Sequence, residues 1–352
     1  MNLFVDCPSV GSSFGPDDEA AMATPKTVPL NLFGVPFGLA GLGEAWTVLA
    51  GFGRAPAAVG VIVLLVSAGA WLAVASAYVL SVARRPPPRS AFPGDLLDPV
   101  AAPFASLAVI TPMLLASLGL YPYAETLGRA VTDVFIVLTV LLGGWFTGQW
   151  IYGSVDLDRF HPGYFLPTVA GGLIGSGAAA TVGQQRLAGV LFGLGVVCWL
   201  VLGSVILGRL FFRPMLPPPL QPTLAIEVAP AAVASLAWFA LQGPRLDGVA
   251  SFLAGYGLLM VLAQIRLLSL YRRLPFMVST WAFTFSWAAV TAVAMVWLEV
   301  AQPGGYRVGQ YVLITVISLL VGGIALRTVV AISRRDLLHA PSGGAPTRVA
   351  AS

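Results

Sequence analysis

The stretch PTLAIEVAPAAVASLAWFALQ, Pro222 to Gln242, is long and apolar enough to cross a membrane, yet Pro230 interrupts it. A spanning helix needs about 20 mostly apolar residues. The next apolar run, 248–271, has a similar length and contains no proline. Because proline removes a backbone hydrogen bond and kinks a helix, this pair predicts a kinked helix followed by a straight one.

The same alternation runs along the whole chain of 352 residues. Ten apolar segments cover residues 29–52, 56–83, 99–120, 123–152, 163–183, 187–212, 222–242, 248–271, 276–300 and 306–333. Proline lies inside or at the start of the odd-numbered segments and is absent from the interior of the even-numbered ones. Backbone groups freed by proline must be satisfied by neighbours or water, so the odd-numbered helices are expected inside the protein. The sequence therefore predicts an all-α integral membrane protein built from five helical hairpins.

The composition agrees with this class. The chain is 57% hydrophobic and 10% charged, with a mean hydropathy of +0.86, whereas soluble domains carry roughly 25% charged residues. Cys7 and Cys198 are too different in their surroundings to predict a disulfide. The sequence contains no phosphate-binding loop, no metal-ligand cluster and no nucleophile beside a base, so neither enzymatic activity nor a cofactor or metal is expected.

The basic residues predict the orientation in the membrane. An even number of helices places both termini on one side, and fourteen of the Lys and Arg residues lie on that side. The positive-inside rule then predicts cytoplasmic termini, and the Ala-, Gly- and Pro-rich composition suggests a bacterial plasma membrane. This distribution accounts for the net charge of +4 without any affinity for nucleic acid. Residues 1–27 and 336–352 are predicted as disordered cytoplasmic tails around a channel domain, 28–335.

The ninth segment carries an unusual group of aromatic residues. Residues three and four apart share a helix face, so Phe285 lies above a smooth surface of Ala288, Ala289 and Ala292. Phe283 shares the other face with Trp287. Spacing alone leaves two interpretations of Phe285 open: an ordinary core aromatic, or a ring that enters a lumen.

Four motifs resemble one known family. PLNLFGVPFGLAGL (29–42), HPGYFLPTVAG (161–171), PTLAIEVAPAAVASLAW (222–238) and WAFTFS (281–286) occur in the order found in the tellurite-resistance/dicarboxylate transporter family. That family includes the bacterial TehA proteins and the plant slow-type anion channels. The resemblance implies ten transmembrane helices in a quasi-fivefold arrangement around a central pore, in a homotrimer, with Phe285 as the gate. Ser286 stands where the family usually has proline.

Eight residues of the odd-numbered helices are expected to line this pore: Pro36, Gly38, Pro112, Gly171, Gly175, Pro230, Ala289 and Ala292. For the fifth helix an alternative stays open. Its small residues Gly171, Gly175 and Ala179 are also spaced for close packing against another helix.

Of the acidic residues within the predicted helices, Glu227 is the candidate for a functional role. Glu227 is expected either to couple proton movement to transport or to remain neutral and hydrogen-bond the backbone near Pro230. Asp133 is expected to pair with Arg129, four residues earlier on the same helix. His161 precedes the fifth helix, and Pro162 after it favours a capping or interfacial role over proton transfer.

Five arginines lie on the non-cytoplasmic side, one for each hairpin: Arg54, Arg129, Arg186, Arg245 and Arg307. They predict either a ring that attracts anions to the pore mouth or, because acidic residues lie nearby in the sequence, separate local ion pairs.

These observations predict a passive channel for small inorganic or carboxylate anions in the lipid bilayer, with Phe285 as its gate. The alternative is a proton-coupled carrier or exporter of dicarboxylates, tellurite or sulfite that uses Glu227.

Overall fold

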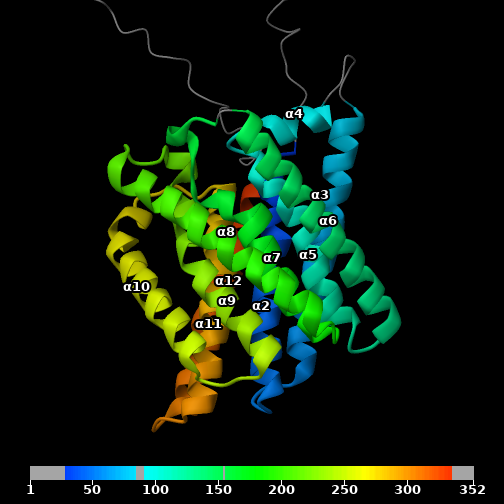
Figure 1. Ribbon diagram of the computed structural model, residues 1–352, viewed down its shortest axis with the longest axis vertical. Coiled ribbons are helices and arrows are strands. Elements are labelled where there is room, and N and C mark those ends of the chain that lie inside the picture. The colour runs from blue at the N-terminus through cyan, green and yellow to red at the C-terminus, as the bar shows by residue number, and fades with distance from the viewer. Residues whose placement is uncertain (1–27, 85–90, 154, 335–352) are drawn as a thin grey trace, which may run out of the picture.

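The computed structural model describes residues 28–84, 91–153 and 155–334, and in these residues it contains helices and no strand. The tails predicted at 1–27 and 336–352 lie outside the described residues. Figure 1 shows the helices side by side in one bundle. We call the end of the bundle that carries Leu30 and Ser333 the terminal face, and the other end the opposite face.

Five long helices form the outside of the bundle. They are α3 (Ala57–Ala83), α6 (Glu125–Tyr152), α8 (Gln185–Phe212), α10 (Gly248–Tyr271) and α12 (Tyr306–Ser333). Each is an uninterrupted α-helix, and only 17–28% of the residues in its most apolar window are buried. Large apolar side chains such as Leu65 and Leu319 point outward, as a lipid environment requires.

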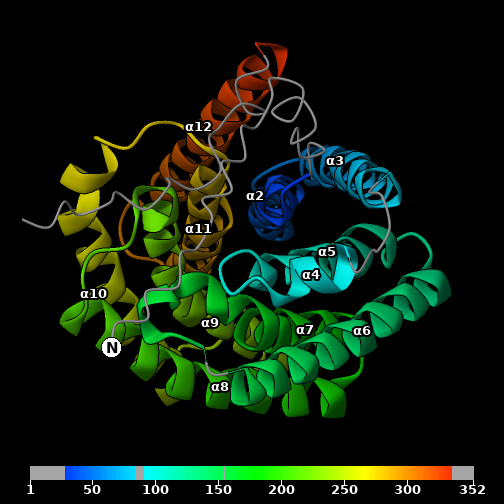
Figure 2. The same cartoon turned by 90° about the horizontal axis from the view of Figure 1, so that it is seen from above.

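Five helical segments alternate with these and lie inside (Figure 2). In chain order they are η1–α2 (Leu30–Phe33, Gly34–Gly51), η2–α5–η3 (Ala102–Ser106, Leu107–Leu115, Ala116–Leu120), η5–η6–α7 (Pro162–Phe165, Leu166–Ala170, Gly171–Thr181), η7–α9 (Pro218–Val228, Ala229–Gln242) and η8–α11 (Val278–Trp281, Ala282–Ala301). The short helices α4 (Ala91–Leu97) and η4 (Leu157–Arg159) lie in connections at the terminal face.

The inner helices close a ring. α2 contacts α5, α5 contacts α7, α7 contacts α9, α9 contacts α11, and α11 returns to α2. Each inner segment starts near the terminal face, because each straight outer helix brings the chain back across the bundle (Figures 1 and 2). All five inner segments therefore run in the same direction.

Nine of the ten segments are long and apolar enough to cross a membrane, counted over the described residues. The segment Pro162–Thr181 is helical throughout but is not among the nine. Its glycines explain its lower apolar character and also its packing: a Cβ on Gly172 would lie 2.7 Å from the backbone nitrogen of Gly195 in α8. α7 and α8 thus approach backbone to backbone.

The predicted difference between kinked and straight helices is confirmed in this form: every inner segment contains a 3₁₀ or π turn, and no outer helix does. Pro112 shows the physical cause. It cannot donate to the carbonyl of Ala108, and that carbonyl instead accepts a hydrogen bond of 3.0 Å from Nε1–H of Trp71 in α3. The outer helix thus satisfies the carbonyl that the proline leaves free.

Three further side chains of outer helices donate to inner backbone carbonyls. Ser67 Oγ–H donates to Pro36 O at 2.7 Å, Gln264 Nε2–H to Leu224 O at 2.8 Å, and Gln310 Nε2–H to Met295 O at 3.1 Å. With Trp71, these donors anchor four of the five inner segments from outside.

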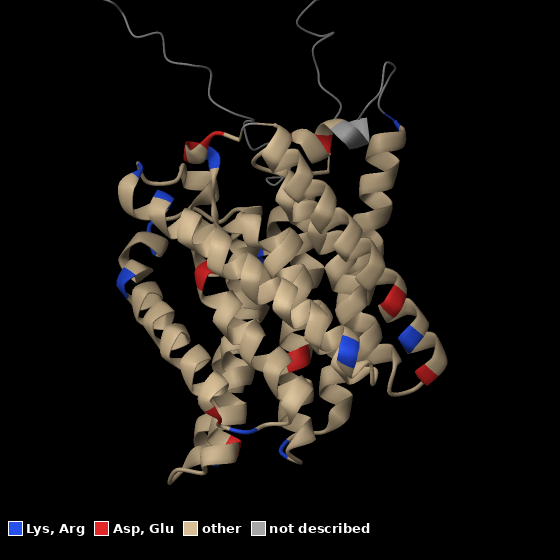
Figure 3. Ribbon diagram, in the orientation of Figure 1, with Lys and Arg blue, Asp and Glu red and all other residues tan. Residues whose placement is uncertain are grey.

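Charged residues gather toward the two ends of the bundle, and few lie in the band between them (Figure 3). This is the distribution expected for a protein that spans a bilayer.

Candidate functional site

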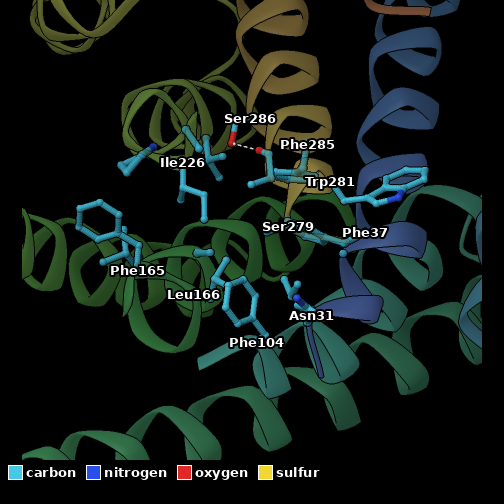
Figure 4. Close-up of a pocket in the computed structure, with 18 of the residues that line it drawn as sticks. Asn31, Phe37, Phe104, Phe165, Leu166, Ile226, Ser279, Trp281, Phe285 and Ser286 are labelled. Carbon is cyan, nitrogen blue, oxygen red and sulfur yellow. Dashed lines mark hydrogen bonds between the residues drawn. The ribbon is translucent and has the colours of Figure 1, made fainter. Parts of the chain in front are cut away.

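Two cavities lie inside the ring of inner helices and meet at Phe285. The terminal-side cavity is lined by residues from the first halves of the inner segments, including Asn31, Phe104, Leu166, Ile226 and Ser279 (Figure 4). The opposite-side cavity is lined by residues from their second halves, including Glu44, Thr47, Ser117, Thr181 and Phe239. Three residues line both cavities, namely Leu173, Val233 and Phe285. They form the constriction between the two.

Phe285 is the aromatic member of this constriction. Its side chain is 5% exposed and stacks on Phe37 of α2, with ring centroids 3.8 Å apart and an angle of 18° between the planes. Gly41, one turn after Phe37, makes room for the ring, because a Cβ at that position would lie 2.7 Å from Cδ2 of Phe285. The ring therefore packs on α2, and a cavity lies on each side of it.

The terminal-side cavity is apolar with a few polar atoms at its wall. No charged residue lines it. Oδ1 of Asn31 and Oγ of Ser279 are buried without a hydrogen-bond partner in the described residues, whereas Oγ–H of Ser286 donates to Ala282 O at 3.0 Å. All five inner α-helices begin beside this cavity, and helix N-termini carry partial positive charge. The cavity is therefore electrostatically suited to an anion without containing a cationic side chain.

The opposite-side cavity has one ionisable residue in its lining, Glu44 of α2. Its carboxyl makes no hydrogen bond or ion pair to any described residue. Thr47, Ser117 and Thr181 supply hydroxyl groups, but each hydroxyl donates to a carbonyl in its own segment. The carboxyl of Glu44 is thus the polar group of this lining that lacks a partner.

The eight residues expected to line a pore occupy different places. Pro230 lines the terminal-side cavity. The other seven line neither cavity: Pro36, Gly38, Pro112, Gly171, Gly175, Ala289 and Ala292. Two of the glycines among them lie where helices approach closely, since a Cβ on Gly38 would collide with Thr284, and one on Gly171 would lie 2.7 Å from Cγ2 of Thr139. Ala289 is buried in the same core cluster as Phe285, and Ala292 is buried in a second cluster with Ala288 and Met295.

Sequence reasoning did not find Phe37, Gly41, Leu173 or Val233. Phe37 and Gly41 lie in the motif at 29–42, close to Pro36. The motif shows their positions in the sequence but does not show that they contact α11. Leu173 and Val233 are ordinary aliphatic residues and carry no signal in the sequence.

Glu227 lies in η7 and is 5% exposed. Its Oε1 is buried without a hydrogen-bond partner in the described residues. The residue lines neither of the two cavities that meet at Phe285. The backbone hydrogen bond to the region of Pro230 that the sequence suggested is not formed by Oε1.

The arginines of the opposite face form local contacts. Arg54 pairs with Glu299 at 3.1 Å, and Arg307 donates to the hydroxyl of Tyr306 at 3.3 Å. Arg186 and Arg245 make no ion pair within the described residues. The contacts of Arg54 and Arg307 favour the local interpretation over a ring.

The prediction that Arg129 pairs with Asp133 was wrong. Arg129 pairs with Glu125 at 3.2 Å, one turn before it, rather than with Asp133. Asp133 instead accepts two hydrogen bonds from Nε2–H of Gln184, at 2.8 and 3.0 Å. The amide from the neighbouring segment competes successfully for the carboxylate.

The predicted cap at the start of the fifth segment is confirmed. Nδ1 of His161 accepts a hydrogen bond from Gly163 N–H at 3.1 Å, and Nε2 lies 3.1 Å from Val100 O. Nδ1 must be unprotonated to accept, so Nε2 carries the hydrogen and donates to Val100. Complete burial, aided by the positive charge of Arg209, lowers the pKa of His161 from 6.5 to about 4. The imidazole is therefore neutral at neutral pH.

Comparison with known proteins adds independent evidence. The model of the voltage-dependent anion channel family matches residues 27–329. A tellurite resistance protein TehA homolog of Haemophilus influenzae is 26% identical over 270 residues, which is 76% of this chain and 80% of that protein. The guard cell S-type anion channel SLAC1 of Arabidopsis thaliana is 26% identical over 159 residues, 45% of this chain and 28% of that protein. The S-type anion channel SLAH1 of the same plant is 29% identical over 211 residues, 59% of this chain and 53% of that protein. The family resemblance read from the four motifs is confirmed.

Proposed function

This chain belongs to the voltage-dependent anion channel family, and from that premise we propose that it conducts small anions passively through a path that Phe285 closes. Membership of this family makes the protein a membrane protein that acts as an anion channel or transporter. The passive mechanism, the gate and the plasma membrane location are the proposed parts.

One observation carries the proposal. Phe285 is an aromatic residue shared by the linings of two cavities that open from opposite halves of the bundle. An apolar ring between two cavities blocks a path both sterically and by excluding water, and it needs no charge to do so. Rotation of the Phe285 ring would join the cavities at the cost of its stack on Phe37.

The electrostatics of the terminal-side cavity support an anion as the permeant species. Five parallel inner segments present their N-terminal ends there, and each end favours negative charge by about 0.3–1 kcal/mol. No Arg or Lys lines either cavity. An anion is thus attracted by partial charges and is not retained by a full one, which permits rapid release.

The proposal includes the assembly in which such a channel would act. We infer that Pro162–Thr181 is the tenth membrane-spanning segment, that the five hairpins have quasi-fivefold symmetry around the path, and that three chains form a homotrimer. Cytoplasmic termini in a bacterial plasma membrane complete the proposal, supported by the excess of basic residues on the terminal side.

A proton-coupled carrier is the second candidate, and the buried carboxyl of Glu227 favours it, because an ionisable group inside a membrane is costly and often functional. Against it, Glu227 lines neither cavity of the path.

Purified protein in a planar bilayer separates the two. A channel passes chloride or nitrate down its own gradient at equal pH on both sides, with a reversal potential that follows the anion. A flux that requires a pH gradient, saturates and moves protons with the anion would contradict the passive mechanism.

A further inference from the structure

One outer helix differs from the other four in its packing. α3 packs between α2 and α5, α6 between α5 and α7, α8 between α7 and α9, and α12 between α11 and α2. α10 packs on α9 and η7, and it touches α11 through the ring of Tyr271, which lies edge-on against Phe283. Apart from this contact, the close helix packing found at the other four outer helices is missing between α10 and α11.

A groove occupies the place of this interface. Its half toward the opposite face has a volume of about 460 Å³ and is lined by Leu253 to Val261 of α10 and Val290 to Ala301 of α11. Its half toward the terminal face, about 470 Å³, is lined by Gln264 to Arg272 of α10, by Thr280 of η8, by Phe283 and Trp287 of α11, and by α12. Val261 lines the first half and Ile265 the second, one helical turn apart on α10, so the two halves follow one another along this helix. From Leu253 to Arg272 the groove runs about 28 Å, close to the thickness of a bilayer core.

The lining is apolar along its length and basic at one end. Alanine, glycine, valine and leucine side chains dominate the half toward the opposite face, and no acidic residue lines either half. Arg272 and Arg327 lie at the end near the terminal face, where they are exposed and make no ion pair with any described residue. Nε1–H of Trp297 is buried in the other half and finds no acceptor among the described residues.

We propose that this groove binds a phospholipid with an anionic headgroup, its acyl chain lying along α11 and its phosphate between Arg272 and Arg327. The charge pattern identifies the occupant. A free anion would gain nothing from a long apolar groove, whereas a phospholipid has an apolar chain and a phosphate at the matching end. Phosphate binds arginine through charge-assisted hydrogen bonds.

A second copy of the chain fits the groove less well. Membrane topology gives every copy its terminal face on the same side, where basic residues prevail. The two free arginines of the groove would then require acidic partners at one depth, whereas anionic lipid supplies them at the headgroup level.

The test measures lipid binding and needs no ion current, so its outcome is independent of the proposed function. The protein is purified, stripped of lipid, and incubated with vesicles of phosphatidylglycerol or of phosphatidylcholine, and bound lipid per chain is counted by native mass spectrometry. We expect retention of phosphatidylglycerol. The double substitution Arg272→Gln and Arg327→Gln is expected to weaken retention about 30-fold, from two lost phosphate contacts.

Two variant pairs make the test specific. Arg273→Gln removes the same charge one residue away from the groove lining and is expected to retain the lipid. Ala294→Phe fills the half toward the opposite face and should reduce retention of both lipids, whereas Val66→Phe on the lipid-facing side of α3 should not. Equal retention of the two lipids, or an unchanged count in the double variant, would overturn the headgroup assignment. Loss of oligomer in Ala294→Phe, with no lipid bound by the native chain, would identify the groove as an interface between copies.

Discussion

The ring of Phe285 lies parallel to the ring of Phe37, with centroids 3.8 Å apart and an interplanar angle of 18°. One residue belongs to α11 and the other to α2, two adjacent members of the inner ring. Such pairs contribute about 0.5–1.5 kcal/mol beyond the burial of their area. The stack thus adds only a small increment, beyond the burial of the ring, to the stability of the position that we propose as closed.

Removal of the Phe285 ring is expected to open the path. In Phe285→Ala the cavities merge, and anion conductance in a bilayer should rise by at least an order of magnitude. Phe283→Ala is the control, since Phe283 is on the same helix but contacts Tyr271 of α10. Equal conductance of the native and Phe285→Ala proteins, both shown to be folded, would remove the gate.

A methyl group at Gly41 is expected to displace the ring. Its Cβ would lie 2.7 Å from Cδ2 of Phe285, closer than van der Waals contact allows, so the closed ring must rotate. We expect Gly41→Ala to raise conductance, though less than Phe285→Ala does. Gly69→Ala on α3, where nothing lies within 4 Å of the added Cβ, should behave as the native chain. A Gly41→Ala protein with native conductance would show that the ring is not held against α2.

Glu44 predicts a pH effect on conduction. An ionised carboxylate in the lining of the opposite-side cavity repels an anion, so the current should fall as the pH on that side rises. Glu44→Gln should conduct about fivefold better at high pH, for an electrostatic difference of about 1 kcal/mol. Single-channel conductance across a pH series measures this, and an unaltered pH profile in Glu44→Gln would contradict it.

Glu227 distinguishes the two candidate functions. For a passive channel, Glu227→Gln should leave the anion current unchanged at equal pH, because the residue lines neither cavity. The neutral amide keeps the shape of the side chain and cannot carry a proton. Abolished uptake of a carboxylate driven by a proton gradient, in vesicles that contain this variant, would instead support the carrier.

His161 predicts how stability depends on pH. Its pKa is about 4 in the folded protein and 6.5 ordinarily, so between these values the unfolded chain binds more protons. Stability should therefore fall as the pH drops from about 6.5 to 4, by about 3 kcal/mol in total. His161→Asn keeps a capping oxygen but does not titrate, and its thermal midpoint should vary less with pH. His339→Asn, which removes the other histidine, should keep the native dependence.

The extent of each helix could be predicted because it depends on apolar length. The segment expected at 248–271 coincides with α10, and the expected run 306–333 coincides with α12. The alternation of inner and outer helices could also be predicted, since proline alters the backbone that carries it. Phe285 was identified only through the motif that surrounds it.

Contacts between segments could not be predicted in the same way. The stack on Phe37 depends on which faces of α2 and α11 meet, and helical periodicity gives the faces of each helix separately. Arg129 had carboxylates one turn away on both sides, and Gln184 of another segment decided between them by binding Asp133. The role of the glycines in the inner segments could not be decided for the same reason. A residue that lines a pore and a residue at a close helix contact both need a small side chain.

The donors Ser67, Trp71, Gln264 and Gln310 hold the inner segments by their backbone carbonyls and approach them from the lipid side. The hydrogen bonds that fix the inner segments therefore involve backbone carbonyls and outer-helix side chains, and not the side chains that line the two cavities. In the proposed channel, a substitution among the residues that face the path would leave these four hydrogen bonds in place, whereas a substitution of one of the four donors would loosen the packing of an inner segment.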